Sequence, residues 1–211
     1  LVLHYSFEEN LGSAEPDRSG TGNDGVCHGT TYAVGGPMGG YRLFDGNNDY
    51  IDCGNDSTLM PTDAITISVL ARYDGYASGG AGSLVNRRPG GNYAGYTLED
   101  YRDGGGDKAS FQVRSGGEWR RAFAPPDSLS IGVWHHIVGT FDGSSVKLYF
   151  DGELSQSIPH SGTITATDMA THIGRNMEGN FYFLGGMDEV RIYNRALSED
   201  EVHILAGQLG E

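Results

Sequence analysis

Polar and aromatic side chains alternate with apolar ones through the middle of the chain. Between residues 96 and 114, Leu98, Phe111 and Val113 are each flanked by polar neighbours. Because successive residues of a strand point to opposite faces, one face would carry the polar and aromatic groups together. His135 is added because alternation in 134–138 leaves it on the face opposite Trp134, His136 and Val138. The candidate ligand-binding residues are Arg88, Glu99, Tyr101, Gln112, Arg114, Trp119 and His135.

This mixture suits carbohydrate binding, in which aromatic planes stack on sugar rings while amides and charged groups hydrogen-bond to hydroxyls. A merely solvated outer face is the alternative. Six arginines fall between positions 87 and 121 of a chain that has only 14 lysines and arginines. They could bind an acidic sugar, such as a uronate or a sulfated unit, through fork-like guanidinium contacts. They could equally pair with neighbouring acids, namely Glu99, Asp100, Asp103, Asp107 and Glu118.

A second group of residues could bind calcium, which prefers six to eight oxygen ligands. Carboxylate and amide oxygens occur beside glycines near both ends of the chain, where backbone carbonyls could approach an ion closely. The alternative is that these are ordinary turn residues, since Asp and Asn favour turns for their own hydrogen-bonding reasons. The candidate ligands are Glu8, Asn23, Asp45 and Asp188.

Catalytic patterns are weak in this sequence. It contains no E-x-D-x-x-E run of the kind that places two carboxylates together on one strand, and no G-x-S-x-G motif. A polysaccharide lyase, which needs a base beside a group that neutralises charge, is kept as an alternative. Its residues would be His135, Tyr101, Gln112 and Arg114.

The length and composition limit the classes of protein to which the chain can belong. The chain has 211 residues, of which 34 are glycine, and a formal net charge of -14. One domain covering residues 1–211 suits this length. The negative charge disfavours nucleic acid and anionic membrane surfaces as partners, and no apolar run of 18 residues predicts a membrane span. The chain starts at Leu1, so we expect that any targeting segment has been removed or lies outside this sequence.

The elements that must position these residues are short strands bounded by Gly, Asn and Asp. Residues 146–154 form the clearest hairpin, with Asp151-Gly152 as its two-residue turn. Ser198 and Glu201 predict a capping box that starts one short helix near the C-terminus. The sequence therefore predicts an all-β fold, a two-sheet antiparallel sandwich of jelly-roll type with one C-terminal helix. Cys27 and Cys53 could be bridged or could be buried free thiols.

Taken in order, several motifs along the chain resemble the laminin-G-like, pentraxin-like domains of the concanavalin A-like lectin/glucanase superfamily. The resemblance implies two curved antiparallel sheets and a structural calcium ion near the N- and C-terminal motifs, with Glu8, Asn23 and Asp188 at ligand positions. The motifs are His4–Glu9, Asp17–Gly20, Gly22–Gly25, Leu43–Ile51, Trp134–Gly143, Leu148–Gly152, Ile173–Arg175 and Gly186–Ser198.

Such domains usually belong to secreted or cell-surface proteins, often ones whose enzymes act on polysaccharides. We therefore expect a non-catalytic, calcium-stabilised module that binds a polysaccharide or other glycan on a concave sheet face. It would be covalently linked to catalytic or further binding domains of an extracellular or cell-surface protein. A protein-interaction or adhesion module of the same fold, and the small polysaccharide lyase, are the alternatives, because fold alone does not decide function.

Overall fold

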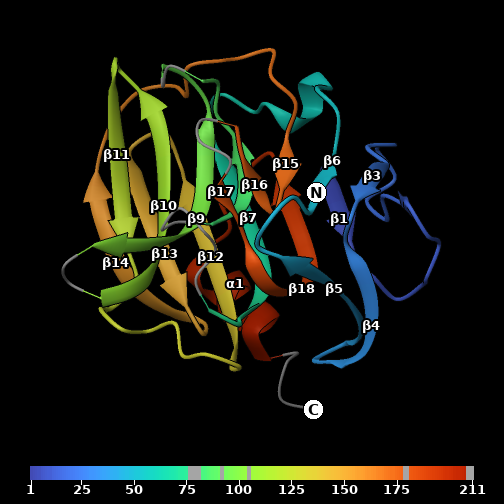
Figure 1. Ribbon diagram of the computed structural model, residues 1–211. Coiled ribbons are helices and arrows are strands. Elements are labelled where there is room, and N and C mark those ends of the chain that lie inside the picture. The colour runs from blue at the N-terminus through green and yellow to red at the C-terminus, as the bar shows by residue number, and fades with distance from the viewer. Residues whose placement is uncertain (76–81, 91–92, 104–105, 178–180, 208–211) are drawn as a thin grey trace.

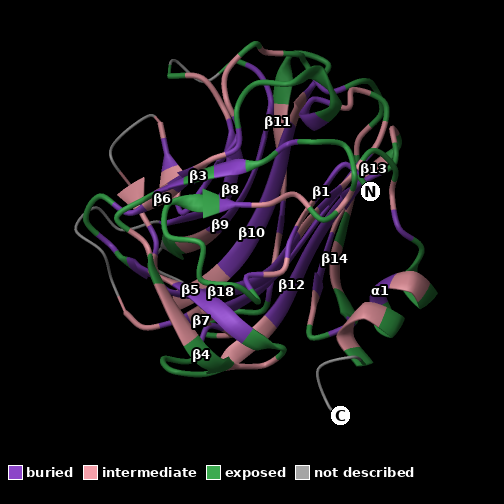
Figure 2. Ribbon diagram, turned by 90° about the vertical axis from the view of Figure 1, so that its right-hand side faces the viewer, coloured by how far each residue is buried: buried purple, intermediate pink, exposed green. Residues whose placement is uncertain are grey.

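The computed structural model describes residues 1–75, 82–90, 93–103, 106–177 and 181–207. Two large antiparallel sheets pack face to face, as the sequence predicts (Figure 1). Figure 2 shows the two layers from the side, with buried residues concentrated between them. Among the described residues, no helix is long and apolar enough to cross a membrane.

The sheet farther from the viewer in Figure 1, sheet 1, has eight strands. Its last strand, β1, pairs with β18 outside the main path. In spatial order the strands are β14 (Glu153–Pro159), β13 (Ser145–Phe150), β12 (Trp134–Phe141), β7 (Ile65–Tyr73), β18 (Leu184–Tyr193), β5 (Gly39–Asp45) and β4 (Thr31–Gly36), with β1 (Leu3–Tyr5) beside β18.

The nearer sheet, sheet 2, also has eight strands, and a two-stranded ribbon of β16 (Arg175–Asn176) and β17 (Phe181–Tyr182) follows its strand β15 along the chain. A short 3-10 helix, Ser57–Leu59, follows β6. In spatial order the strands are β11 (Glu118–Phe123), β10 (Gly106–Ser115), β9 (Tyr96–Asp103), β8 (Ser83–Arg87), β15 (His172–Ile173), β6 (Tyr50–Asp52), β3 (Gly25–His28) and β2 (Ala14–Glu15).

The core lies between the inner faces of the two sheets. Phe111 of β10 lies directly opposite Leu98 on β9 and Ala122 on β11, and all three are fully buried. Its ring also packs against Gly139 of sheet 1, where a Cβ atom would lie 2.2 Å from Phe111 Cγ. The absence of a side chain at Gly139 therefore lets the two sheets approach closely at this point.

Local structure agrees with the predicted turn and helix. Asp151 and Gly152 join β13 to β14 with φ values of 50° and 86°, as a type I′ turn requires. Helix α1 (Glu199–Gly207) begins with the predicted capping box. The amide of Ser198 donates to Glu201 Oε2 at 2.9 Å, and the amide of Glu201 donates to Ser198 Oγ at 3.2 Å.

Cys27 and Cys53 are both buried and free. Cys27 pairs with Ile51 across β3 and β6, so Cys53 is its diagonal neighbour on the same face. Diagonal neighbours in a sheet lie about 7–8 Å apart, which is beyond the usual reach of a disulfide. Of the two alternatives, a disulfide bridge or two buried free thiols, the structure has the free thiols.

Candidate ligand-binding face and metal site

The outer face of sheet 2 brings together most of the predicted ligand-binding residues. Gln112 lies opposite Thr97 on one side and Arg121 on the other, and Arg114 lies opposite Trp119. Glu99 and Tyr101 follow Thr97 at alternate positions of β9, so they share this face. Arg88, just beyond β8, places its guanidinium carbon 4.9 Å from the centre of the Trp119 ring. The predicted alternation in β9 and β10 is thus correct.

Charges at the middle of this face are paired. Glu99 is 4% exposed, and its Oε1 lies 3.1 Å from Arg121 Nη2. Ser110 Oγ and Gln112 Nε2 donate to the same carboxylate oxygen at 3.1 and 3.3 Å. The Arg121 guanidinium also lies 4.4 Å from the Tyr101 ring centre. The Glu99–Arg121 pair thus connects Gln112 to the Tyr101 ring.

The six clustered arginines divide into different environments. Arg121 pairs with Glu99, Arg120 with Glu118, and Arg102 lies 3.7 Å from Asp107. Arg87 is 1% exposed, and it donates to the carbonyl oxygens of Asn55, Asp56 and Thr167. Pairing therefore accounts for part of the cluster. Arg114 is different, because no carboxylate among the described residues lies within salt-bridge distance of it.

A row of buried polar side chains crosses the centre of the outer face. His172, Asn86, Thr97 and Gln112 are direct cross-strand partners on β15, β8, β9 and β10, and we call them the polar row. All four are less than 5% exposed. Three of their polar atoms have no hydrogen-bond partner within the described structure: His172 Nδ1, Asn86 Nδ2 and Thr97 Oγ1. Buried polar atoms are normally hydrogen-bonded, so three such atoms on neighbouring strands are unusual.

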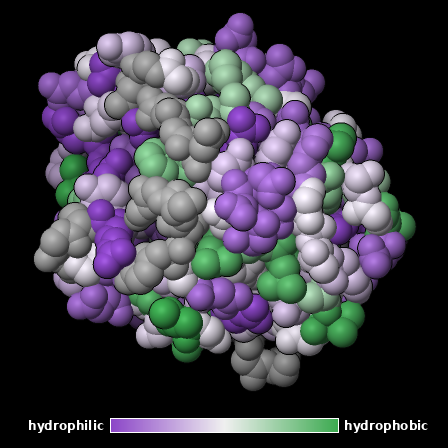
Figure 3. All heavy atoms as spheres, in the orientation of Figure 1, coloured by the Kyte–Doolittle hydropathy of each residue, from purple (hydrophilic) through white to green (hydrophobic). Residues whose placement is uncertain are grey.

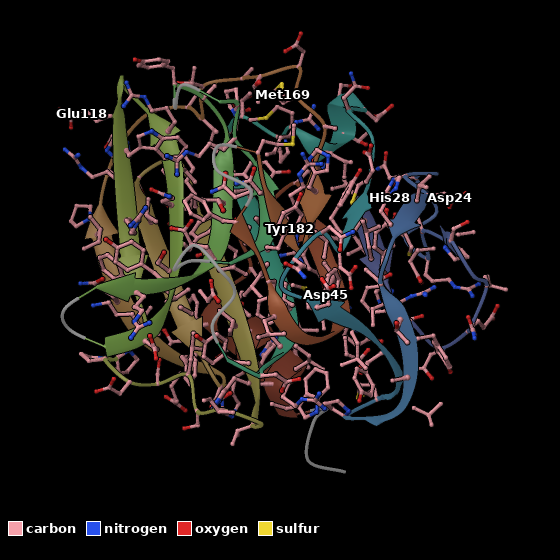
Figure 4. All side chains as sticks on the ribbon, in the orientation of Figure 1. Asp24, His28, Asp45, Glu118, Met169 and Tyr182 are labelled. Atoms are coloured by element: carbon pink, nitrogen blue, oxygen red, sulfur yellow. The ribbon has the colours of Figure 1, made fainter. Side chains whose placement is uncertain are left out.

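The far end of the same face carries a cluster that the sequence reasoning missed. The rings of His28 and Tyr50 are stacked with centroids 4.4 Å apart, and His172 meets Tyr50 edge-on at 5.6 Å. Arg175 lies 4.7 Å from the Tyr50 ring centre and 5.9 Å from that of Tyr182. We call these five residues the Tyr50 cluster; Figure 4 labels His28 and Tyr182. Alternation about buried Ile51 was the signal that could have placed Tyr50 outward.

The outer face therefore has accessible groups at both ends and a polar centre. Tyr50, Tyr101, Trp119 and Arg175 are all partly exposed. Figure 3, which views the molecule from this side, shows mainly hydrophilic and near-neutral residues apart from the grey atoms. Such a surface offers ring faces, amides and cations to a polar ligand.

His135 does not belong to this face. It lies on β12 of sheet 1, opposite Ala71 of β7, and its Nδ1 is 2.8 Å from Asp151 Oδ2. Its ring also packs against Phe150 at 4.6 Å. The prediction that groups His135 with Tyr101 and Gln112 is therefore corrected, because alternation within a strand does not tell which sheet the strand joins. The lyase constellation is not assembled as expected.

Glu8 and Asp188 meet at the outer side of sheet 1, together with Glu189. One ligand atom from each of these three side chains lies within 4.8 Å of the others. A register shift in β18 and a positive φ of 50° at Glu189 bring two adjacent residues to the same place. Simple alternation would have separated them, so the sequence reasoning did not include Glu189.

The surroundings of Asp188 fit a hard cation. Asp188 is fully buried, and within the described residues its Oδ1 has no hydrogen-bond partner. Burial, together with the charges of Glu189 and Glu8, raises the pKa of Asp188 to about 7. A Cβ atom at Gly39 would lie 2.5 Å from Glu8 Oε2, so the backbone closes tightly over the carboxylates. Three carboxylates, one of which has an oxygen without a partner among the described residues, belong to the class of donors that calcium prefers, although Glu189 Oε2 is also paired with His4 and Arg191.

Asn23 and Asp45 lie in other hydrogen-bond networks. Asn23 Nδ2 donates to the carbonyl of Val2 and to the hydroxyls of Thr21 and Thr58. Asp45 is exposed, and its Oδ1 accepts from the amides of Asn47 and Asn48. Both act as turn residues here, whereas Glu8 and Asp188 come together as predicted.

With these features in place, the chain can be assigned to a class: it is a jelly-roll sandwich with a polar and aromatic outer face. Residues 45–203 match the family model described as the concanavalin A-like lectin/glucanases superfamily, and the chain belongs to that family. The chain is also 27% identical, over 95 residues, to the mouse (Mus musculus) Sushi, von Willebrand factor type A, EGF and pentraxin domain-containing protein 1. That match covers 40% of the chain and 3% of the mouse protein.

Solved structures share this fold at low identity. Domain 4 of AbnA, an extracellular GH43 arabinanase from Geobacillus stearothermophilus in complex with arabinotriose, is 21% identical with a TM-score of 0.74, and 98% of each chain is covered. The binding domain of Paraclostridial Mosquitocidal Protein 1 is 19% identical with a TM-score of 0.79. In that comparison the match covers 98% of this chain and 51% of the other.

Proposed function

We propose that this protein is a non-catalytic carbohydrate-binding module, and that the outer face of sheet 2 is its binding surface. The polar row carries the proposal, since three buried polar atoms on adjacent strands lack partners among the described residues. Sugar hydroxyls both donate and accept hydrogen bonds, so a sugar chain that displaces the groups covering the row could satisfy all three atoms. The Trp119 ring at one end could stack on a sugar face, whereas the faces of the Tyr50 ring at the other end already contact His28 and Arg175.

The wider setting of the module is also part of the proposal. A module of this kind would belong to a larger extracellular or cell-surface protein and would be linked to catalytic or binding domains. The arabinanase domain, solved with arabinotriose, supports this setting by analogy of fold. A single module would bind weakly, and linkage to other units would raise its effective concentration at the polymer.

Binding to immobilised polysaccharides tests the proposed surface. Trp119→Ala should weaken retention of a bound polysaccharide about tenfold or more, because a ring that stacks on the ligand is removed. Trp134→Ala is the matched control: Trp134 lies on sheet 1, where its ring meets Tyr41 edge-on at 5.3 Å. Equal losses in the two variants, or retention of no polysaccharide by the wild-type chain, would contradict the proposal.

Calcium bound by Glu8, Asp188 and Glu189 is the second part of the proposal. The ion would neutralise the acid cluster and tie the segment after β1 to β18, so its role would be structural. Free calcium at 100 times the dissociation constant would add about 2.7 kcal/mol of stability. That corresponds to a rise in Tm of about 5–10 °C for a domain of this size.

Thermal unfolding in EDTA and in calcium measures this effect. Asp188→Asn should abolish the calcium-dependent rise in Tm, whereas Asp45→Asn should leave it intact because Asp45 lies in a separate turn. A wild-type Tm that is the same in both buffers would exclude the metal site. The glycan-binding proposal would stand in that case, since it concerns the other sheet.

Binding to a protein rather than a glycan is the competing function. The mosquitocidal protein neighbour is named as a binding domain, and botulinum neurotoxin D contributes a receptor-binding domain of the same fold, 17% identical with a TM-score of 0.72. Those names describe the neighbours. Failure of every polysaccharide in the assay above would favour this alternative.

A further inference from the structure

Two arginines on the outer face of sheet 2 differ from the other arginines there. Arg121 is neutralised by Glu99, as described above. Arg114 and Arg175 have no carboxylate within salt-bridge distance among the residues that the structure describes. Both residues are partly exposed, so a ligand can reach part of each side chain. On a chain with a net charge of -14, cations left without counter-charges are unusual.

The position of Arg175 is fixed by aromatic contacts instead of by an acid. Its guanidinium lies over Tyr50 at 4.7 Å, and its Nε, which is buried, has no hydrogen-bond partner in the described part of the chain. His172, whose Nδ1 is also without a partner, meets the same Tyr50 ring. Asp52 is the acid on this strand face, opposite His172, and its Oδ1 accepts from the amide of Gly54. The Arg175 guanidinium is therefore held in place by ring contacts, and no acid occupies its N–H donors within the described residues.

The polar row connects the two free guanidinium groups. Arg114 is on β10, and Arg175 stacks over Tyr50 of β6, with β9, β8 and β15 between these strands. Four strand spacings correspond to about 19 Å across the sheet. The unpartnered atoms of His172, Asn86 and Thr97 lie along this path. A ligand that crosses the strands would thus meet a cation, a series of polar atoms and a second cation.

We infer that the glycan bound on this face is acidic, with one negative group held at Arg114 and another at Arg175. The inference rests on the proposed carbohydrate-binding function. Guanidinium groups bind carboxylate and sulfate oxygens through paired hydrogen bonds, which a neutral hydroxyl matches less well. The sugar units between the two charges satisfy the polar row. The ligand class is therefore a polyuronate or a sulfated polysaccharide whose chain runs across β10, β9, β8, β15 and β6.

Matched pairs of polymers distinguish the effect of the polymer's charged groups on binding from the effect of its sugar backbone. Polygalacturonate and its fully methyl-esterified form differ only in the carboxylate, and carrageenan and agarose differ chiefly in sulfate. Binding would be measured by affinity electrophoresis and by calorimetry for the wild-type chain. The expected result is that the charged member of at least one pair binds at least tenfold more tightly than its neutral partner, and which pair responds tells carboxylate from sulfate.

Variants then assign the charge to its residues. Arg175→Gln and Arg114→Gln should each weaken binding of the charged polymer about tenfold and leave any binding of the neutral polymer unchanged. Arg175→Lys keeps the charge without the planar fork, so it should recover part of the affinity. Arg102→Gln is the control: it removes an exposed charge beside Asp107 on the same sheet, and it should have no effect. Thermal unfolding of each variant checks that the fold is retained.

The outcomes distinguish this inference from the proposed function. Equal affinity for both members of each pair, with loss of binding in Trp119→Ala, would overturn the acidic specificity and keep the carbohydrate-binding module. If both Arg→Gln variants still prefer a charged polymer, residues other than Arg114 and Arg175 recognise the charge of the polymer. That result would also overturn the inference. No binding to any of the four polymers would contradict both.

Discussion

The two outer faces of the sandwich are used in different ways. On sheet 1, helix α1 covers an apolar cluster of Val138, Tyr149, Leu197 and Val202. The buried His136 on the same sheet has Ser68 Oγ as a partner 2.8 Å from its Nε2, while its Nδ1 has no partner among the described residues. On sheet 2, the corresponding central positions are the polar row, and three of its atoms have no partner among the described residues. Figure 2 shows α1 on the side of the molecule opposite β8 and β6.

This difference indicates what each face contributes. Covering an apolar strand face with a helix stabilises the fold, because the side chains leave water. A buried polar atom without a partner lowers the stability of the fold. Such atoms are commonly kept where a ligand supplies the missing hydrogen bond. The contrast is therefore consistent with the proposal that the helix-covered face mainly stabilises the fold and that the outer face of sheet 2 binds the ligand. Four measurements can break or sharpen that contrast.

Acid should act most strongly through the helix-covered face. Burial lowers the pKa of His136 to about 4, while an unfolded histidine titrates near 6.5. The unfolded state therefore binds the extra proton first, and stability present above pH 6.5 is lost as the pH falls through 4. The loss is at most about 3 kcal/mol. Urea unfolding at pH 7 and pH 4 would measure it.

His136→Gln should remove the His136 contribution, whereas Asp188, whose pKa is raised, stabilises the fold as the pH falls from 7 to 4 and does so in both proteins. A smaller part of the loss in acid would remain, since burial also lowers the pKa of His172. The same change in stability between pH 7 and pH 4 in the wild type and in His136→Gln would argue against a buried neutral His136.

Truncation beneath the helix should lower stability without touching recognition. Val202 is fully buried, and Val202→Ala should cost about 2 kcal/mol and lower Tm by about 4–8 °C. Ile204 on the same helix is 63% exposed, so Ile204→Ala is the matched control and should change Tm little. Loss of glycan affinity in the folded Val202→Ala protein would mean that the two faces are not independent.

The smallest effect should come from one substitution made on both faces. Thr66 of sheet 1 and Thr97 of sheet 2 are both fully buried. Thr66 Oγ1 donates to the carbonyl of Arg195 and accepts from the amide of Leu197, so Thr66→Val should destabilise by about 1–2 kcal/mol. Thr97 Oγ1 has no partner in the described structure, so Thr97→Val should leave stability unchanged or raise it by up to about 1 kcal/mol.

The effects of the two Thr→Val substitutions on glycan binding should be in the opposite order to their effects on stability. Thr97→Val should weaken glycan binding severalfold, and Thr66→Val should not. If Thr97→Val destabilises the protein as much as Thr66→Val, the hydroxyl has an internal role, and the polar row is not a recognition surface.

Much of the fold could be predicted from sequence because its signals are local. The Asp151-Gly152 turn and the capping box at Ser198 depend on a few adjacent residues, and both were correct. Alternation in β9 and β10 also placed Glu99, Tyr101, Gln112 and Arg114 on one face. In β8 simple alternation does not hold, since a register shift between Ser83 and Val85 leaves both Leu84 and Val85 in the core.

The rest of the candidate site depends on pairing between distant segments. The Tyr50 cluster draws on β3, β6, β15 and the β16–β17 ribbon, whose adjacency no local pattern reveals. His135 was assigned to the wrong sheet for the same reason. Glu189 joined the acid cluster through a bulge, which breaks the alternation that a sequence pattern assumes.

A titration of isotope-labelled protein with a short oligogalacturonate, followed by amide chemical shifts in NMR, tests the central claim most directly. The account predicts saturable shifts at Asn86, Thr97, Gln112 and His172 and at residues beside Tyr50, with sheet 1 beneath α1 unchanged. Shifts confined to sheet 1, or to α1 and its neighbours, would contradict the assignment of recognition to the outer face of sheet 2.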